Sequence, residues 1–162
     1  GKIRYWSLSQ YGHQDISNYL QISRNTGKPP IASLQNSYNI LSQRESTETL
    51  FPLIRRANLG VQTIATHAAG MLVPGYNPEP GSRHESLLKS LDQVSAELGV
   101  PRSQVCVAWV LSHPELTTAL SGAKSPEHVE DNMSGASLKL PDGALKILNS
   151  ARKTYRLNVS ER

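Results

Sequence analysis

The sequence contains a single cysteine, Cys106, and this scarcity excludes an internal disulfide framework. We interpret the thiol as buried and inert rather than reactive, because apolar residues surround it in the chain. We therefore expect a reducing compartment and a cytoplasmic location. No apolar run approaches the roughly 20 residues that span a bilayer, so we expect no membrane partner. No Cys and His spacing suits a metal, and no P-loop or Gly-x-Ser-x-Gly motif occurs.

The sequence also lacks a cluster of residues that carry the same charge. The formal net charge is +4, but the basic residues are scattered, and only Arg55-Arg56 and Arg152-Lys153 are adjacent pairs. This is too little for a nucleic-acid surface, although the excess suits an anionic ligand. The 162 residues, 38% apolar and 19% charged, suffice for one soluble globular domain covering residues 1–162. The chain begins with Gly1 rather than Met, which leaves open a processed end or a fragment.

Short apolar runs alternate with helical patterns along the chain. Strands are expected at 3–9, 31–35, 61–66 and 116–121, and helices at 15–25, 46–58, 86–98, 102–112, 125–133 and 142–155. Gly60 is expected to end the second helix. A loop rich in Pro and Gly is expected at 67–85, and a C-terminal helix and tail at 141–162. The alternation predicts parallel βαβ units, either in a small open sheet or in part of a barrel.

Four segments decide between these folds. Residues 1–11, Gly-Lys-Ile-Arg-Tyr-Trp-Ser-Leu-Ser-Gln-Tyr, resemble the fifth-strand signature of the aldo-keto reductases, Gly-Lys-Ile-Arg-Tyr-x-Gly-x-Ser-Asn. Residues 34–41 are similar to the family's sixth-strand segment, 107–114 to the helix before strand eight, and 122–132 to the segment that binds the adenosine phosphate. The resemblance implies an α/β fold in which parallel (β/α) units form the C-terminal half of a (β/α)8 TIM barrel.

The resemblance also implies a function. The complete protein is expected to be an NADP(H)-dependent carbonyl oxidoreductase, but the family's catalytic Asp, Tyr, Lys and His lie on the first four strands, upstream of Gly1. We therefore expect no catalytic residue in this chain and no activity from this chain alone. The expected partners are a dinucleotide and either a second copy or a chain that supplies the missing half-barrel. The alternative is a non-catalytic regulatory or interaction protein built on a degenerate half-barrel.

Three residues match the family's contacts to the nicotinamide carboxamide. Ser9 and Gln10 match the usual Ser-Asn pair, although Gln10 is one methylene longer than Asn, and a polar strand end facing solvent is the alternative interpretation. Gln35 matches the family glutamine at a strand end, where barrel sites lie. The segment 66–69 replaces the family's stacking Tyr by Thr66, so cofactor binding is expected to be weak or lost. We interpret His67 as a loop residue rather than as a replacement base.

A second group of residues matches the family's adenosine-phosphate segment. Lys124 supplies a positive charge, and Ser125 with Pro126 begins a helix whose first N–H groups favour an anion. The alternative is that Ser125 is only a helix cap. His128 stands where many NADP-dependent members carry Arg, which holds a phosphate more firmly. Asp131 and Asn132 match the adenine-side contacts.

Overall fold

The computed structural model describes residues 2–41 and 46–157. Within them a parallel four-stranded sheet has the order β1-β2-β3-β4. The strands are β1 (Ser7–Ser9), β2 (Ser33–Ser37), β3 (Gly60–Ile64) and β4 (Thr118–Ala119). Because each strand is followed by helical structure, the structure confirms the expected α/β fold with parallel strands.

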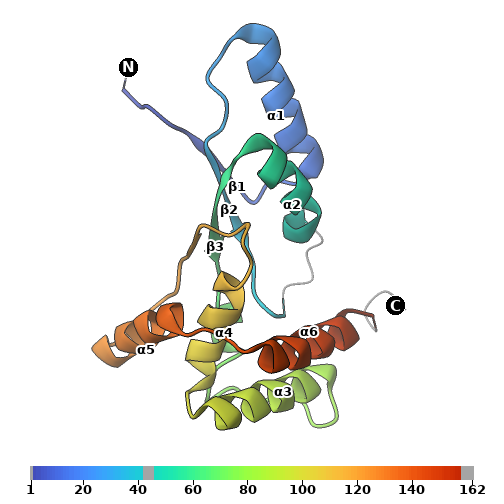
Figure 1. Cartoon of the computed structure of the whole chain (residues 1–162), viewed down its shortest axis with the longest axis vertical. Coiled ribbons are helices and arrows are strands. Elements are labelled where there is room, and N and C mark those ends of the chain that lie inside the picture. Colours follow the sequence, from blue (N-terminus) through green and yellow to red (C-terminus); the bar gives the residue numbers. More distant parts are fainter. Residues whose placement is uncertain (1, 42–45, 158–162) are drawn as a thin grey trace.

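Six α-helices connect and follow the strands in the described part of the chain. They are α1 (His13–Thr26), α2 (Ser46–Ala57), α3 (Arg83–Leu98), α4 (Arg102–Leu111), α5 (Pro126–Ser137) and α6 (Asp142–Leu157), with a short 3-10 turn η1 (Ala68–Gly70). Figure 1 shows α1 and α2 together on one side of the sheet, α3 beside α6, and α5 projecting away from them.

The two faces of the sheet differ in chemistry. Leu8, Leu34 and Val61 share the face that the helices bury, and the exposed fraction of Leu34 and Val61 is 1% each. Side chains alternate between the two faces of a strand, so the residues between them point the other way. Apart from the half-buried Ile64, that opposite face carries small and polar side chains that are half-buried or exposed: Ser7, Ser9, Ser33, Gln35, Ser37, Gln62 and Thr118. We call this set the polar face.

The edge strands are shorter than the sequence predicts. Strand β1 begins at Ser7, not at Ile3, and the side chains of Ile3 and Tyr5 are 74% and 80% exposed. Pairing with β2 begins at the Ser7–Ser33 pair, and just before it Trp6 O accepts from Ala32 N–H over 2.9 Å. Strand β4 has only two residues, against six predicted. Short edge strands offer few unpaired main-chain groups to another chain.

Two predicted boundaries are also corrected. Gly60 does not end α2 but begins β3, and Asn58, with a φ of 51°, takes the left-handed conformation after the helix instead. Helix α3 begins at Arg83, inside the segment 67–85 expected to be a loop. The reason is a capping box: Glu85 N–H donates to Ser82 Oγ over 3.2 Å, and Gly81 N–H donates to Glu85 Oε2 over 2.7 Å.

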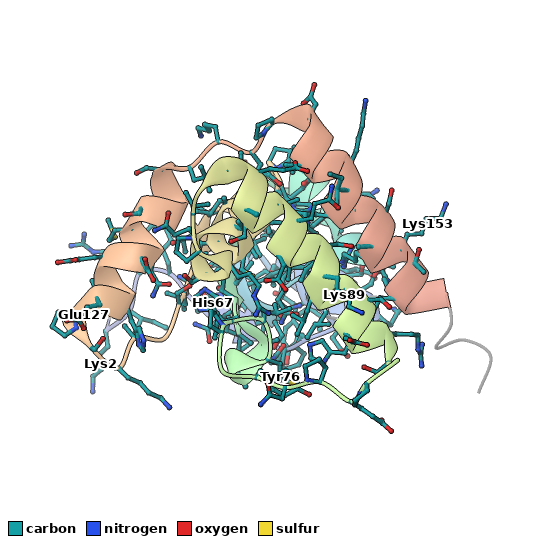
Figure 2. All side chains as sticks on the ribbon, turned by 90° about the horizontal axis from the view of Figure 1, so that it is seen from below. Lys2, His67, Tyr76, Lys89, Glu127 and Lys153 are labelled. Carbon is teal, nitrogen blue, oxygen red and sulfur yellow. The ribbon has the colours of Figure 1, made fainter. Side chains whose placement is uncertain are left out.

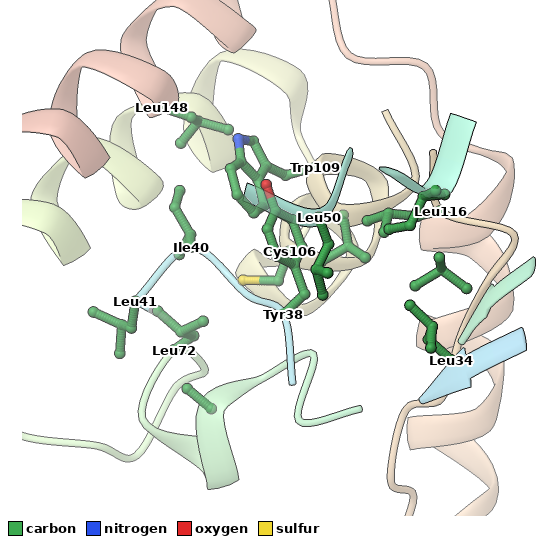
Figure 3. Close-up of a cluster of buried hydrophobic side chains, with 14 of the residues drawn as sticks. Leu34, Tyr38, Ile40, Leu41, Leu50, Leu72, Cys106, Trp109, Leu116 and Leu148 are labelled. Carbon is green, nitrogen blue, oxygen red and sulfur yellow. The ribbon is translucent and has the colours of Figure 1, made fainter. Parts of the chain in front are cut away.

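The core is centred on two stacked rings. The rings of Tyr38 and Trp109 are nearly parallel with centroids 5.5 Å apart, and Arg152 of α6 lies over both. Figure 3 shows this stack with Leu148 of α6 nearby and the Cys106 sulfur beside Tyr38. Burial raises the pKa of the Cys106 thiol to about 12, which confirms the interpretation of an inert, buried cysteine.

Candidate functional site

The register of the sheet brings two of the expected residues together. Ser9 of β1 is the register partner of Gln35 of β2, and Gln35 is in turn the partner of Gln62 of β3. All three side chains belong to the polar face, and Gln35 Nε2 donates to Gln62 Oε1 over 3.3 Å. Ligands of parallel α/β sheets bind at the carboxyl ends of strands, and Ser9 is the last residue of β1. Gln35 is not at the strand end that the sequence predicts, because β2 continues to Ser37, and Gln62 likewise lies in the middle of β3.

Gln10 lies at the same edge but its amide is already engaged. Its Nε2 donates to Ser37 Oγ over 2.7 Å, and its Oε1 accepts from Ser37 N–H over 3.1 Å. Its own N–H is within hydrogen-bond distance of both Gln35 O and the side chain of buried Asn36. The φ of 62° at Gln10 is a conformation that Asn, the usual family residue, adopts more readily. The Ser37 bonds hold the Gln10 amide in this orientation and leave one N–H and one oxygen lone pair for a carboxamide.

The turn after β3 is tied to its surroundings. Thr66 is 1% exposed and its hydroxyl donates to Leu120 O over 3.1 Å, so it joins the end of β3 to the residues that leave β4. His67 Nε2 bonds Ser103 O of α4 over 3.2 Å, and burial lowers the pKa of this imidazole. Because a carbonyl oxygen only accepts, Nε2 carries the proton. His67 is anchored to the main chain of α4, as the loop-residue interpretation expects.

Helix α5 begins with caps made by the expected residues. His128 N–H donates to Ser125 Oγ over 3.4 Å, and Lys124 N–H donates to His128 Nδ1 over 3.3 Å. Ser125 is therefore the N-cap, and the His128 imidazole closes back onto the preceding residue. The exposed side chain of Lys124 leaves a cation available for an anion at this helix end.

The sequence interpretation counted the Glu127 N–H in the anion site but did not weigh the Glu127 carboxylate. It lies in the first turn of α5, and a hydrogen bond from the Ser125 side chain is the main cause that lowers the pKa of this exposed carboxyl. Figure 2 shows Glu127 at the outer end of α5 and His67 nearer the middle of the molecule. Its negative charge opposes a phosphate at the same helix end. An acidic residue one position after Pro126 was readable in the sequence as a helix-start signal.

Asp131 and Asn132 make contacts within the protein. The Asp131 carboxylate accepts from Ser103 Oγ over 3.2 Å and from Gln104 Nε2 over 3.0 Å, which joins α5 to α4. Asn132 Nδ2 donates to Gly122 O over 3.5 Å, in the segment between β4 and α5. These bonds fix the place of α5 relative to the sheet.

The residues at the sheet and the residues at the start of α5 differ in how well they fit a dinucleotide. At the sheet, the Ser9 hydroxyl and the Gln35 amide fit a carboxamide, and no described residue donates a hydrogen bond to Gln35 Oε1. At α5, the first N–H groups are partly satisfied by Ser125, and Glu127 adds a charge of the wrong sign beside Lys124. The nicotinamide end of the site therefore fits better than the phosphate end.

Comparison with known proteins identifies the class. The model of the aldo/keto reductase family matches residues 1–153, and the chain belongs to that family. A curated relative, an aryl-alcohol dehydrogenase of Pestalotiopsis microspora, is 25% identical over 150 residues, which cover 86% of this chain. The match covers only 39% of the relative's own length, so the chain spans about two fifths of that protein.

The described part of the chain lacks two features. Within residues 2–41 and 46–157, no helix is both long and apolar enough to cross a membrane. The same residues contain no group of three or more His, Cys, Asp and Glu side chains arranged to hold a metal ion.

Proposed function

We propose that this chain is the cofactor-binding part of an NADP(H)-dependent carbonyl oxidoreductase. The observation that supports this most is the Ser9–Gln35 pair on the polar face of the sheet in a member of the aldo/keto reductase family. The proposal includes the C-terminal half of a (β/α)8 barrel, with further strands covering the polar face. The short match to the longer relative supports that view.

In this proposal the chain binds and orients the cofactor, which supplies the hydride. The Ser9 hydroxyl and the Gln35 amide hold the carboxamide, and this fixes which face of the nicotinamide ring meets the carbonyl compound. Lys124 and the start of α5 hold the adenosine phosphate. Asp131 and Asn132 act by holding α5 in place through Gln104 and Gly122. No residue of this chain is assigned a proton transfer, and the catalytic acid is proposed to lie on strands outside it.

The cofactor is proposed to bind weakly. Thr66 offers no aromatic face, since its side chain is buried and bonded to Leu120 O. The Gln10 amide is engaged by Ser37, and Glu127 opposes the phosphate. The free thiol of Cys106 supports a cytoplasmic location within the same proposal.

Calorimetric titration of NADP+ into the wild-type protein tests the proposal. Gln35→Ala removes one hydrogen bond to the carboxamide and should weaken binding about three- to tenfold. Gln21→Ala is the matched control, because Gln21 is an exposed glutamine on α1 and should leave the affinity unchanged. Absence of any binding to the wild type, or equal effects of both variants, would contradict the proposal.

The hydrogen bonds that Gln10 and Thr66 make within the protein also favour a second function. Because Gln10 and Thr66 already bond within the protein, the chain fits a non-catalytic regulatory or interaction protein that keeps the family fold. In that case a second copy or another chain would cover the polar face. Steady oxidation of NADPH by the protein, with an aromatic aldehyde as substrate, would rule out this alternative.

A further inference from the structure

Exposed apolar side chains gather at the two open ends of the sheet. In the described part of the chain, β1 and β4 each have a single neighbouring strand. Apart from Met71, the large apolar side chains that are exposed there belong to two segments, 3–22 around β1 and 120–133 after β4: Ile3, Tyr5, Tyr11, Ile22, Leu120, Val129 and Met133. Groups of exposed apolar side chains mark interaction surfaces. Both ends of the sheet are therefore candidate interfaces.

The two ends are chemically complementary. At the β1 end, Trp6, Tyr11 and Tyr19 form a row of edge-to-face rings, with centroids 5.8 Å apart for Trp6 and Tyr19 and 5.9 Å apart for Tyr11 and Tyr19. At the β4 end, Val129 and Met133 are exposed one turn apart on α5. A methionine sulfur packs favourably against the edges of aromatic rings. One end of the chain therefore offers side chains that the other end can bind, which favours a second copy of this chain as the partner.

The register of the sheet indicates where a second copy would pair. Ser9, Gln35, Gln62 and Thr118 form one row of register partners across the four strands. In a closed barrel of eight parallel strands, such a row returns to its first strand shifted by about eight residues. Two identical halves must divide that shift between two equivalent seams, with about four residues at each. Thr118 of one copy would then lie opposite Tyr5 of the other copy.

The position of Tyr5 agrees with this seam. A shift in the other direction would place Thr118 opposite His13, which is the first residue of α1 and so does not lie in a strand. Because side chains alternate along a strand, an even shift keeps Tyr5 and Thr118 on the same face of the sheet. Tyr5 and Ile3 would then point into the barrel, where bulky side chains usually fill the interior. Their high exposure in the single chain is thereby explained.

We propose that two copies of this chain close head to tail into an eight-stranded barrel. In this dimer β4 of each copy pairs with residues 3–7 of the other, and Val129 and Met133 pack against the aromatic row of the other copy. The inference rests on the half-barrel in the proposed function, and it names the chain that completes this half-barrel. Because a second copy brings strands but no catalytic acid, the dimer belongs with the non-catalytic function.

Sedimentation equilibrium of the protein without cofactor tests the assembly. We expect a limiting mass of two chains, because a closed two-fold assembly uses both ends of each copy. Met133→Glu should raise the dissociation constant of the dimer at least about tenfold, since it places a charge in the apolar contact. Met71→Glu is the matched control, because Met71 lies outside both ends, and it should leave the constant unchanged. A limiting mass of one chain or of more than two, or equal effects of the two variants, would overturn the inference.

A disulfide tests the seam even if Met133→Glu does not fold. Within one chain, Tyr5 and Thr118 lie toward opposite edges of the sheet, three strand spacings of about 4.8 Å apart, which is farther than a disulfide reaches. Across the proposed seam they are neighbours, so the double variant Tyr5→Cys with Thr118→Cys should form a covalent dimer on mild oxidation. Each single variant should not, because Cys106 is buried and inert. A double variant without covalent dimer, or an equal yield from either single variant, would contradict the seam.

The inference and the proposed function can fail separately. If the wild type binds NADP+ but sediments as one chain, the proposed function stands and the dimer is wrong. If it sediments as two chains and binds no NADP+, the dimer stands and the cofactor-binding function fails.

Discussion

Gly135 of α5 lies against α4, and its replacement by alanine has two opposing effects on the free energy of unfolding. In a helix with open surroundings, Gly→Ala stabilises the protein by about 1 kcal/mol because alanine loses less backbone entropy on folding. At Gly135 a Cβ would lie 2.8 Å from Gln104 Cα, 2.9 Å from Gln104 O and 3.0 Å from Val107 Cβ. Two of these three atoms belong to the main chain of α4, so no side chain can simply rotate away.

The crowding should outweigh the helix preference. Overpacking of this kind destabilises by about 1–3 kcal/mol, and main-chain contacts place this site toward the upper part of that range. After subtracting about 1 kcal/mol for the helix preference, we expect Gly135→Ala to lower the free energy of unfolding by about 2 kcal/mol. The separation of α5 from α4 also stretches the bonds from Ser103 and Gln104 to Asp131.

Gly143 is the matched control. It lies in the first turn of α6, and an added Cβ would meet no atom within 4 Å. We expect Gly143→Ala to raise the free energy of unfolding by up to about 1 kcal/mol. Urea unfolding followed by circular dichroism, at one protein concentration, compares the two variants with the wild type. Stabilisation by both substitutions would refute the close approach of α4 and α5.

Three further predictions concern the site. Glu127→Gln should strengthen NADP(H) binding about three- to tenfold more than it strengthens NAD(H) binding. Lys124→Ala should weaken NADP(H) binding more than NAD(H) binding. Calorimetric titration with both cofactors measures both effects. Ala65→Gly should stabilise the protein by about 0.5–1 kcal/mol in urea unfolding, because Ala65 has a φ of 58° that only glycine adopts freely. Burial lowers the pKa of His67, so the unfolded chain binds the proton more readily than the folded protein. The free energy of unfolding should therefore fall as the pH drops below about 6.5, and it should fall less in the His67→Gln variant.

The sequence predicted the helices better than the strands. The order of elements and the start of α2 and α6 agree with the expectation, because long amphipathic patterns and caps act locally. The strands depend on which neighbours they pair with. Thus β1 is confined to Ser7–Ser9 although Tyr5 and Trp6 precede it, and β4 is confined to Thr118–Ala119 although Leu116 and Leu120 lie on either side. The capping box at Ser82 was readable in the sequence, and it places the start of α3.

For the candidate site, the sequence indicated two neighbouring residues but not the hydrogen bonds around them. The sequence pointed to Ser9 and Gln35, and the register makes them neighbours. It could not show that the Gln10 amide bonds Ser37, because this contact joins residues 27 positions apart in sequence. The bond from Gln35 to Gln62 was also missed. Gln62 follows an apolar residue early in β3 as Gln35 does in β2, and that parallel was the available signal.

The polar face has a consequence for calorimetry. Covering apolar surface lowers the heat capacity of a protein, whereas covering polar surface raises it. An association that buries Ser9, Gln35, Gln62 and Thr118 would cover their hydroxyl and amide groups together with their methylene and methyl groups. The polar and apolar contributions would then offset each other, and the heat-capacity change would be near zero. The opposite face, with Leu8, Leu34 and Val61, contributes to the large heat-capacity increase of unfolding. For this protein, a small heat-capacity change on binding a partner would therefore be compatible with an extensive interface.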